Sequence, residues 1–131
     1  MVAATIKTPA VPRIKATLYF SSEDGRTLVT ASSDGAAYVW DVTTGQRELL
    51  LVGATGAVED VAISPNGNEI ATGSADRIAR IYNAHNGGLI APLSGSADAV
   101  TSVEFDPSGR TLVTASSDGT ARLWDVQPLG N

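Results

Sequence analysis

The stretch GRTLVTASSDG at residues 25–35 occurs again, letter for letter, at residues 109–119. Each copy leads into the tripeptide Trp-Asp-Val, at residues 40–42 and 124–126, and a diverged copy lies between them at residues 67–83. Two chemically different markers share a spacing of 42 residues: the turn aspartates Asp34, Asp76 and Asp118, and the aromatic residues Trp40, Tyr82 and Trp124. One period held at both positions identifies an internal repeat.

The residues around these markers predict short strands separated by turns. In the third copy, apolar and β-branched residues at 100–105, 110–116 and 121–124 are interrupted by the breakers at 106–109 and 118–119. The earlier copies repeat this pattern, with further strands expected at 14–20, 46–52 and 89–93. The sequence therefore predicts an all-β fold.

The sequence resembles the WD-repeat family, whose repeats have a period of 40–45 residues and end in Trp-Asp. The resemblance covers nearly the whole chain. It implies a single-domain β-propeller segment of three four-stranded antiparallel blades, at residues 14–56, 57–98 and 99–131. The last of these offers only three strands. In the family an N-terminal strand commonly completes the last blade. The resemblance thus assigns residues 1–8, with Val2 to Lys7 as the strand, to that closing role and residues 9–13 to a linker. The completed blade belongs either to this chain or to a neighbouring one.

Composition narrows the class of protein. The chain has 131 residues, 43% of them apolar and 18% charged, which fits a globular domain. Its net charge of −5 argues against a nucleic-acid partner. No cysteine is present, so a cytoplasmic location is expected. The longest aliphatic run, at residues 49–52, is far too short for a membrane span.

The resemblance also implies a hydrogen-bonded set in each blade, linking the turn aspartate, a strand serine or threonine, the strand aromatic residue and the histidine of a Gly-His pair. The residues that match this pattern are Asp34, Ser32 and Trp40; Asp76, Ser74 and Tyr82; and Asp118, Ser116 and Trp124. The Gly-His pair is missing, because Ala54 follows Gly53 and Ser96 follows Gly95. Without the imidazole, we expect each aspartate to cap the amides of its own turn.

Catalytic and metal chemistry lack their usual residues. The one histidine, His85, is expected in an exposed turn, so a Ser-His-Asp triad has no oriented base. The carboxylates are spread one or two per turn, and neither a His/Cys cluster nor a phosphate-binding loop is present. We therefore expect no catalytic residue, metal or cofactor, and no enzyme activity.

WD-repeat propellers usually bind peptides or protein surfaces on one face, beside the turn aspartates and at the starts of the first strands. The residues that match these places are Ser33, Glu59, Ala75, Arg77, Thr101 and Ser117. Arg77 is the one among them of a type that commonly anchors interfaces. The resemblance therefore implies a protein or peptide partner without identifying it.

Three blades leave two flanking faces that need covering. The leading hypothesis is a non-catalytic protein-interaction scaffold that completes a ring by homo-oligomerisation, as two or three copies, or as part of a longer chain. The alternative is a regulatory or sensor segment of a larger multidomain signalling protein. A propeller enzyme comes third, because no base, nucleophile and metal come together in the sequence.

Overall fold

The computed structural model describes residues 14–21 and 25–126 and shows an all-β protein, with eleven strands and no helix in that part. Blade 1 comprises β1 (Ile14–Ser21), β2 (Gly25–Ser32), β3 (Ala37–Asp41) and β4 (Gln46–Leu51). Blade 2 comprises β5 (Val58–Ile63), β6 (Glu69–Ser74), β7 (Ala79–Asn83) and β8 (Leu89–Leu93). Blade 3 comprises β9 (Val100–Phe105), β10 (Thr111–Ser116) and β11 (Ala121–Asp125).

Each blade is an antiparallel meander in which consecutive strands are neighbours, with four strands in blades 1 and 2 and three in the described part of blade 3. The predicted all-β propeller segment is therefore confirmed. The closing strand predicted at Val2 to Lys7 and the linker at residues 9–13 lie outside the described residues.

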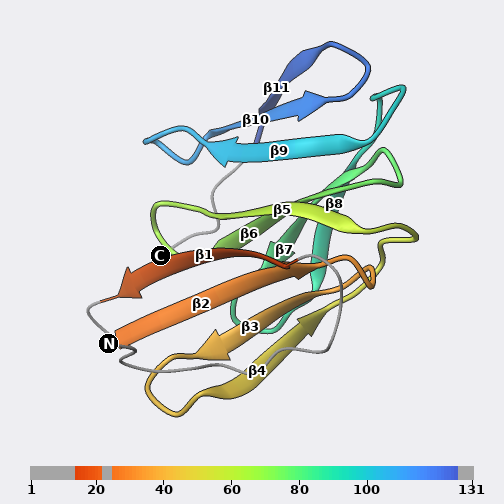
Figure 1. Ribbon diagram of the computed structural model, residues 1–131. Coiled ribbons are helices and arrows are strands. Elements are labelled where there is room, and N and C mark those ends of the chain that lie inside the picture. The colour runs from red at the N-terminus through yellow and green to blue at the C-terminus, as the bar shows by residue number, and fades with distance from the viewer. Residues whose placement is uncertain (1–13, 22–24, 127–131) are drawn as a thin grey trace, which may run out of the picture.

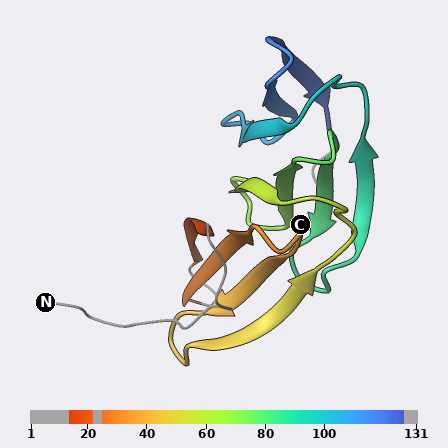
Figure 2. The same ribbon diagram turned by 45° about the vertical axis from the view of Figure 1, so that its right-hand side comes forward.

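The blades stand side by side and fan out in an arc (Figures 1 and 2). The first strands β1, β5 and β9 lie along the concave side, where β5 is packed between the other two, and β4 and β8 lie on the convex side. Alternate turns fall on opposite rims. One rim carries the β2–β3, β6–β7 and β10–β11 turns, on the right of Figure 1, and we call it the aspartate rim.

The core consists of two clusters, one between each pair of adjacent blades. In the first, Val29, Ala31, Ala37 and Val39 of blade 1 meet Val58, Val61, Ile70 and Tyr82 of blade 2. In the second, Ala71, Ala79 and Ile81 of blade 2 meet Val100, Val103 and Leu112 of blade 3. Because strand side chains alternate, each blade has one face toward the next blade in the chain, which we call its forward face, and one toward the preceding blade.

Small residues allow the sheets to approach closely. A Cβ on Gly73 would lie 2.9 Å from Cγ1 of Val100 in the next blade. Alanines occupy the neighbouring positions Ala71 and Ala79 on the same face. The high content of Gly and Ala thus follows from sheet-on-sheet contact as well as from the turns.

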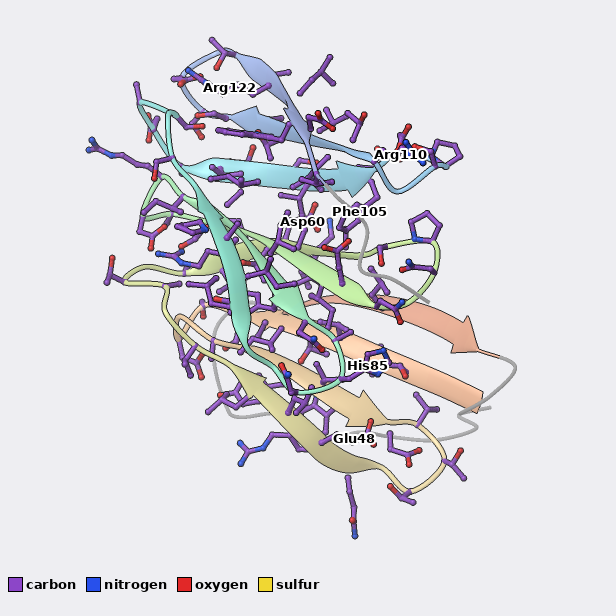
Figure 3. The ribbon with its side chains drawn as sticks, turned by 180° about the vertical axis from the view of Figure 1, so that it is seen from behind. Glu48, Asp60, His85, Phe105, Arg110 and Arg122 are labelled. Atoms are coloured by element: carbon purple, nitrogen blue, oxygen red, sulfur yellow. The ribbon has the colours of Figure 1, made fainter. Side chains whose placement is uncertain are left out.

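Asp60 is a buried carboxylate that links the blades at their first strands. These strands are sheet edges, so some of their amides have no partner within the sheet. Oδ1 of Asp60 accepts a hydrogen bond from the Val61 amide at 3.0 Å, and Oδ2 accepts one from the Val103 amide of blade 3, also at 3.0 Å. Lys15 of blade 1 lies 3.8 Å from Oδ1. Figure 3 shows Asp60 in the middle of the molecule, between blades 2 and 3.

Replacing Asp60 with alanine leaves two buried amides without an acceptor. At roughly 1–3 kcal/mol for each unsatisfied group, we expect Asp60→Ala to lower the free energy of unfolding by about 2–4 kcal/mol in urea denaturation. Glu104→Ala, which removes an exposed carboxylate from neighbouring β9, is the matched control, with an expected change within about 0.5 kcal/mol. Equal losses in the two variants would contradict a linking role for Asp60.

Candidate functional site

The predicted turn aspartates all lie on the aspartate rim, one in each blade. Each accepts a hydrogen bond from the amide two residues later in its own turn: Ala36 to Asp34, Ile78 to Asp76 and Thr120 to Asp118, over 2.9–3.1 Å. The aspartate amides in turn donate to the hydroxyls of Ser32, Ser74 and Ser116 at 3.1–3.2 Å. The expected capping of each turn by its own aspartate is therefore observed.

The aromatic residues hydrogen-bond to a threonine, and not to the serine named with them in the predicted set. Nε1 of Trp40 donates to Oγ1 of Thr30 at 2.9 Å, and Nε1 of Trp124 donates to Oγ1 of Thr114 at 3.0 Å. The reason is the register. Trp40 pairs with Leu28, so the next residue on that face is Thr30, whereas Ser32 lies one pair further along, at the turn.

Blade 2 has a different ring at this position. Tyr82 is the repeat equivalent of Trp40 and Trp124, and its hydroxyl donates to the Val52 carbonyl at 2.8 Å. The phenol thus ties blade 2 to the segment that leads into it from blade 1. Burial raises the pKa of Tyr82 above its usual value of 10.

A third partner of each aspartate comes from the strand after the turn, at a position that sequence reasoning missed. Arg80 forms a two-pronged ion pair with Asp76, with contacts of 2.7 and 3.2 Å, and both side chains are 7% exposed. Arg122 approaches Asp118 at 3.5 Å, and the Tyr38 hydroxyl donates to Asp34 at 2.9 Å. These residues share the 42-residue spacing, which is the signal that could have revealed them.

The aspartates of blades 2 and 3 also hold the connection that enters their blade. Asp76 accepts from the Thr55 amide at 3.0 Å, and Asp118 accepts from the Ala97 amide at 2.8 Å. These connections contain the glycines of the incomplete Gly-His pairs. A Cβ on Gly53 would lie 3.6 Å from Nε of Arg80, and one on Gly95 would lie 3.7 Å from Nε of Arg122. An arginine from the same blade therefore contacts both the aspartate and the glycine segment, and the network exists without histidine.

These contacts keep the aspartates ionised. Burial raises the pKa of Asp76, but hydrogen bonds from Arg80 and from the Thr55 and Ile78 amides outweigh it and hold the pKa at about 2. Hydrogen bonds from the Thr120 hydroxyl and the Ala97 amide keep the pKa of Asp118 well below its usual range. Burial also raises the pKa of Asp34, but Ser32 and Tyr38 lower it further.

The six predicted partner-binding residues lie on the same rim. Ser33, Ala75, Arg77 and Ser117 are in the turns after β2, β6 and β10. Glu59 and Thr101 are the extra residues of β-bulges, where β5 and β9 shift register against β6 and β10. A bulge turns the extra residue out of the ladder. The structure thus brings the six onto one surface, and their binding role stays a prediction.

Arg77 has the one positive-φ backbone among the described non-glycine residues, at 78°. The equivalent positions in blades 1 and 3 are Gly35 and Gly119, at 93° and 87°. A residue with a Cβ is strained in this region by roughly 1–2 kcal/mol. The exposed Arg77 is therefore a side chain that blade 2 presents at a cost in stability.

His85 lies on the other rim, in the β7–β8 turn, where its Nε2 is 2.8 Å from Oδ1 of Asn68. Figure 3 shows it well separated from Arg122, which marks the aspartate rim. In the described ranges no three His, Cys, Asp or Glu side chains are grouped as metal ligands. Nor does that part of the chain contain a helix long and apolar enough to cross a membrane.

Comparison with known proteins gives one family. The family described as "WD domain, G-beta repeat" matches residues 16–41, 45–83 and 87–125. Over 45 residues, 34% of this chain and 13% of the relative, the sequence is 42% identical to the U5 small nuclear ribonucleoprotein 40 kDa protein of Dictyostelium discoideum.

Two solved structures show the same architecture. The computationally designed Ika4 protein matches with a TM-score of 0.71 and 27% identity, over 84% of this chain and 64% of that one. A chain of an active polycomb repressive complex 2 in the basal state matches with a TM-score of 0.79 and 28% identity, over 88% of this chain and 26% of that one. The chain thus spans only part of the length of each of these three proteins.

The strain at Arg77 predicts a stabilising substitution. Arg77→Gly relieves the positive-φ strain but adds freedom to the unfolded chain, so we expect a net gain of about 0.5–1 kcal/mol in urea denaturation. Arg77→Ala removes the guanidinium and keeps the strain, so its stability should stay within about 0.5 kcal/mol of wild type. The strain would be disproved if the glycine variant were no more stable than the alanine variant.

The lowered aspartate pKa values predict sensitivity to acid. The folded pKa of Asp76, about 2, lies below its unfolded value, so its stabilisation is complete above about pH 4 and is lost as the pH falls toward 2. We expect the Asp76→Asn variant to be less stable than wild type at pH 7. Between pH 5 and 2, its free energy of unfolding should fall by about 1–2 kcal/mol less than that of wild type. Asp125→Asn, which changes an exposed carboxylate, should have the same dependence of unfolding free energy on pH as wild type. Parallel pH dependence in wild type and both variants would refute the role of Asp76 in acid sensitivity.

Proposed function

Because this chain belongs to the WD-repeat family, we propose that it is a non-catalytic protein-interaction scaffold, and that the forward face of blade 3 is its assembly face. On this proposal the face packs against another WD blade, supplied by a second copy or by further repeats of a longer polypeptide. The observation that carries the proposal is the exposure of one residue, Leu123, compared with its repeat equivalents.

Leu123 is 75% exposed, whereas the equivalent Val39 and Ile81 are each 2% exposed. The latter two are covered by the next blade along the chain. Their cross-strand partners follow the same rule, because Val29 and Ala71 are fully buried whereas Val113 is only half-buried. Blade 3 therefore carries an apolar forward face of the same kind as blades 1 and 2, and no described residue covers Leu123.

The free energy gained by burying this apolar face favours its coverage by another blade. A blade face measures about 17 Å along its strands and about 19 Å across four of them, or roughly 300 Å². Covering an apolar surface of that size is worth several kcal/mol, at about 25 cal/mol per Å² and as an upper estimate. The stability of a whole domain is typically about 5–15 kcal/mol. Association that covers the face therefore has a substantial driving force.

The charged side chains support binding over catalysis. On the aspartate rim, arginines and turn amides of the same blade engage the carboxylates of Asp76 and Asp118, which also accept amides of the connection from the preceding blade. His85 is on the other rim and has Asn68 as its neighbour. General acid–base or nucleophilic chemistry needs a base beside a nucleophile, and these groups are not arranged in that way.

A protein or peptide ligand is proposed for the aspartate rim, where the six predicted residues lie together. Arg77 is the side chain that best suits an anchor, because it is exposed and because blade 2 holds it in a strained backbone conformation. A cytoplasmic setting is proposed from the absence of cysteine. The polycomb complex chain, of which this chain spans 26%, supports the alternative in which this unit is one segment of a larger regulatory protein.

Light-scattering mass tests the assembly face. We expect the 131-residue chain to form a defined assembly of two or three copies and Leu123→Glu to be a monomer, because the buried carboxylate costs several kcal/mol. Leu89→Glu is the matched control, since Leu89 is 51% exposed on the outer strand of blade 2, and it should keep the wild-type mass. An assembly whose mass is unchanged by Leu123→Glu would overturn the proposal, and a wild-type monomer at all concentrations would exclude a second copy as the source of the covering blade.

A further inference from the structure

Among the described arginines of the aspartate rim, Arg77 alone has a guanidinium that the chain itself does not use. Arg80 makes two contacts with Asp76, at 2.7 and 3.2 Å, and Arg122 lies 3.5 Å from Asp118. Within residues 14–21 and 25–126, by contrast, no group forms a hydrogen bond or an ion pair with the Arg77 side chain. The donors of this exposed side chain are therefore free to contact another molecule.

The aspartate that precedes Arg77 does not neutralise it, because both oxygens of that carboxylate are occupied. Oδ1 of Asp76 accepts hydrogen bonds from the Ile78 amide and from Arg80. Oδ2 of Asp76 accepts from the Thr55 amide and from Arg80. The Arg80 side chain is only 7% exposed, so water competes little for these contacts. Blade 2 thus has one arginine that completes its own turn and a second for which the turn provides no carboxylate.

The presence of an arginine at position 77 is specific to blade 2 and is not part of the pattern that the three repeats share. Blades 1 and 3 have Gly35 and Gly119 there, and glycine adopts this positive-φ backbone without strain. Arg77 lowers the stability of the turn and gains no side-chain contact among the described residues. Backbone strain that the fold itself does not use points to a function. The use of the side chain therefore lies in contact with a ligand.

A guanidinium selects an anionic group with two oxygens in one plane. Its parallel N–H groups match the oxygens of a carboxylate, and the pair of Arg80 with Asp76 shows this match in the same blade. A phosphate group is the other common partner of arginine, but it carries a charge of about −1.5 to −2 at neutral pH. The charge around Arg77 distinguishes between these two ligands.

Exposed carboxylates lie on both sides of Arg77 along the rim. Asp34 is in the turn of blade 1 and Asp98 is in the connection to blade 3, and blade 2 stands between those blades. Both aspartates are exposed, and neither forms an ion pair with a described residue. These groups and the net charge of −5 repel a phosphate or a nucleic acid more strongly than a single carboxylate. They also attract basic groups placed beside that carboxylate.

We propose that the aspartate rim binds a peptide segment in which one aspartate or glutamate pairs with Arg77, with basic residues on either side of it. The basic residues are attracted by Asp34 and Asp98. The inference rests on the rim ligand proposed above and gives that ligand a chemical class. Arg77 is then the residue that determines specificity, because a peptide with a neutral residue at the central position leaves its guanidinium without a partner.

A selection from a library of random linear peptides displayed on phage tests this inference. We expect wild type to enrich peptides that have one acidic residue between basic residues, and Arg77→Gly to enrich none of them. Because Arg77→Gly relieves backbone strain, unfolding does not explain a loss of binding in this variant. Arg110→Ala is the matched control, since it removes an exposed arginine from the opposite rim (Figure 3), and it should enrich the same peptides as wild type.

An enriched peptide is then synthesised with glutamate, glutamine or phosphoserine at the acidic position, and its dissociation constant is measured by fluorescence anisotropy. Glutamine in place of glutamate removes a charge-assisted pair of hydrogen bonds, so it should weaken binding to wild type about fivefold to tenfold. The same change should have no effect on binding to Arg77→Gly. The phosphoserine peptide should bind wild type no more tightly than the glutamate peptide, because Asp34 and Asp98 repel its additional charge.

The outcomes separate this inference from the proposed function. Enrichment of the same acidic peptides by Arg77→Gly, equal affinity of wild type for the glutamate and glutamine peptides, or tighter binding of phosphoserine would each overturn the inference. Enrichment by wild type of peptides without an acidic residue also overturns it, but leaves a peptide ligand standing. If no peptide is enriched, both the inference and the rim ligand fail. The assembly face is tested separately, by the mass of Leu123→Glu.

Discussion

Each blade of this chain is a small sheet with two apolar faces, and every other feature of the fold depends on covering them. The two core clusters lie between blades, not within them, so a blade has no core of its own. Ile70 and Leu112 are fully buried because a neighbouring sheet lies on them. The stability of each blade therefore depends on its contacts with the neighbouring blades, as in other repeat proteins. The glycines and alanines of the forward faces, such as Gly73, set the distance at which this contact is made.

Polar groups align the stacked sheets in two places. On the concave side, Asp60 accepts hydrogen bonds from the equivalent amides of Val61 in blade 2 and Val103 in blade 3. On the aspartate rim, Asp76 and Asp118 each join a turn, the arginine that follows it and the connection from the preceding blade. The ion pair of Asp76 with Arg80 lies within blade 2 and holds the carboxylate that accepts the Thr55 amide of that connection. Apolar contact thus drives the stacking, and these polar contacts favour one relative placement of the blades.

Most of the fold could be predicted from sequence, because the 42-residue period and the turn residues are local signals. The aspartate caps could be predicted for the same reason. The remaining site residues depend on register and on neighbouring blades. Thr30, and not Ser32, meets Trp40 because of the strand pairing. The contact between Asp60 and the Val103 amide joins residues 43 apart in different sheets. Arg80 was hidden because one aligned position holds tyrosine in blade 1 and arginine in blades 2 and 3, so it shows no single residue type.

The identical stretches at residues 25–35 and 109–119 form an internal control for the effect of environment. With the same letters and the same turn, they form β2 and β10, yet Val29 is fully buried and Val113 is only half-buried. Local sequence cannot cause that difference, so the cause is the presence or absence of a following blade. A surface exposed to water has no need of the residues that fill a sheet-to-sheet contact. Blade 3 nevertheless retains them at both Val113 and Leu123, which is the composition of a covered face.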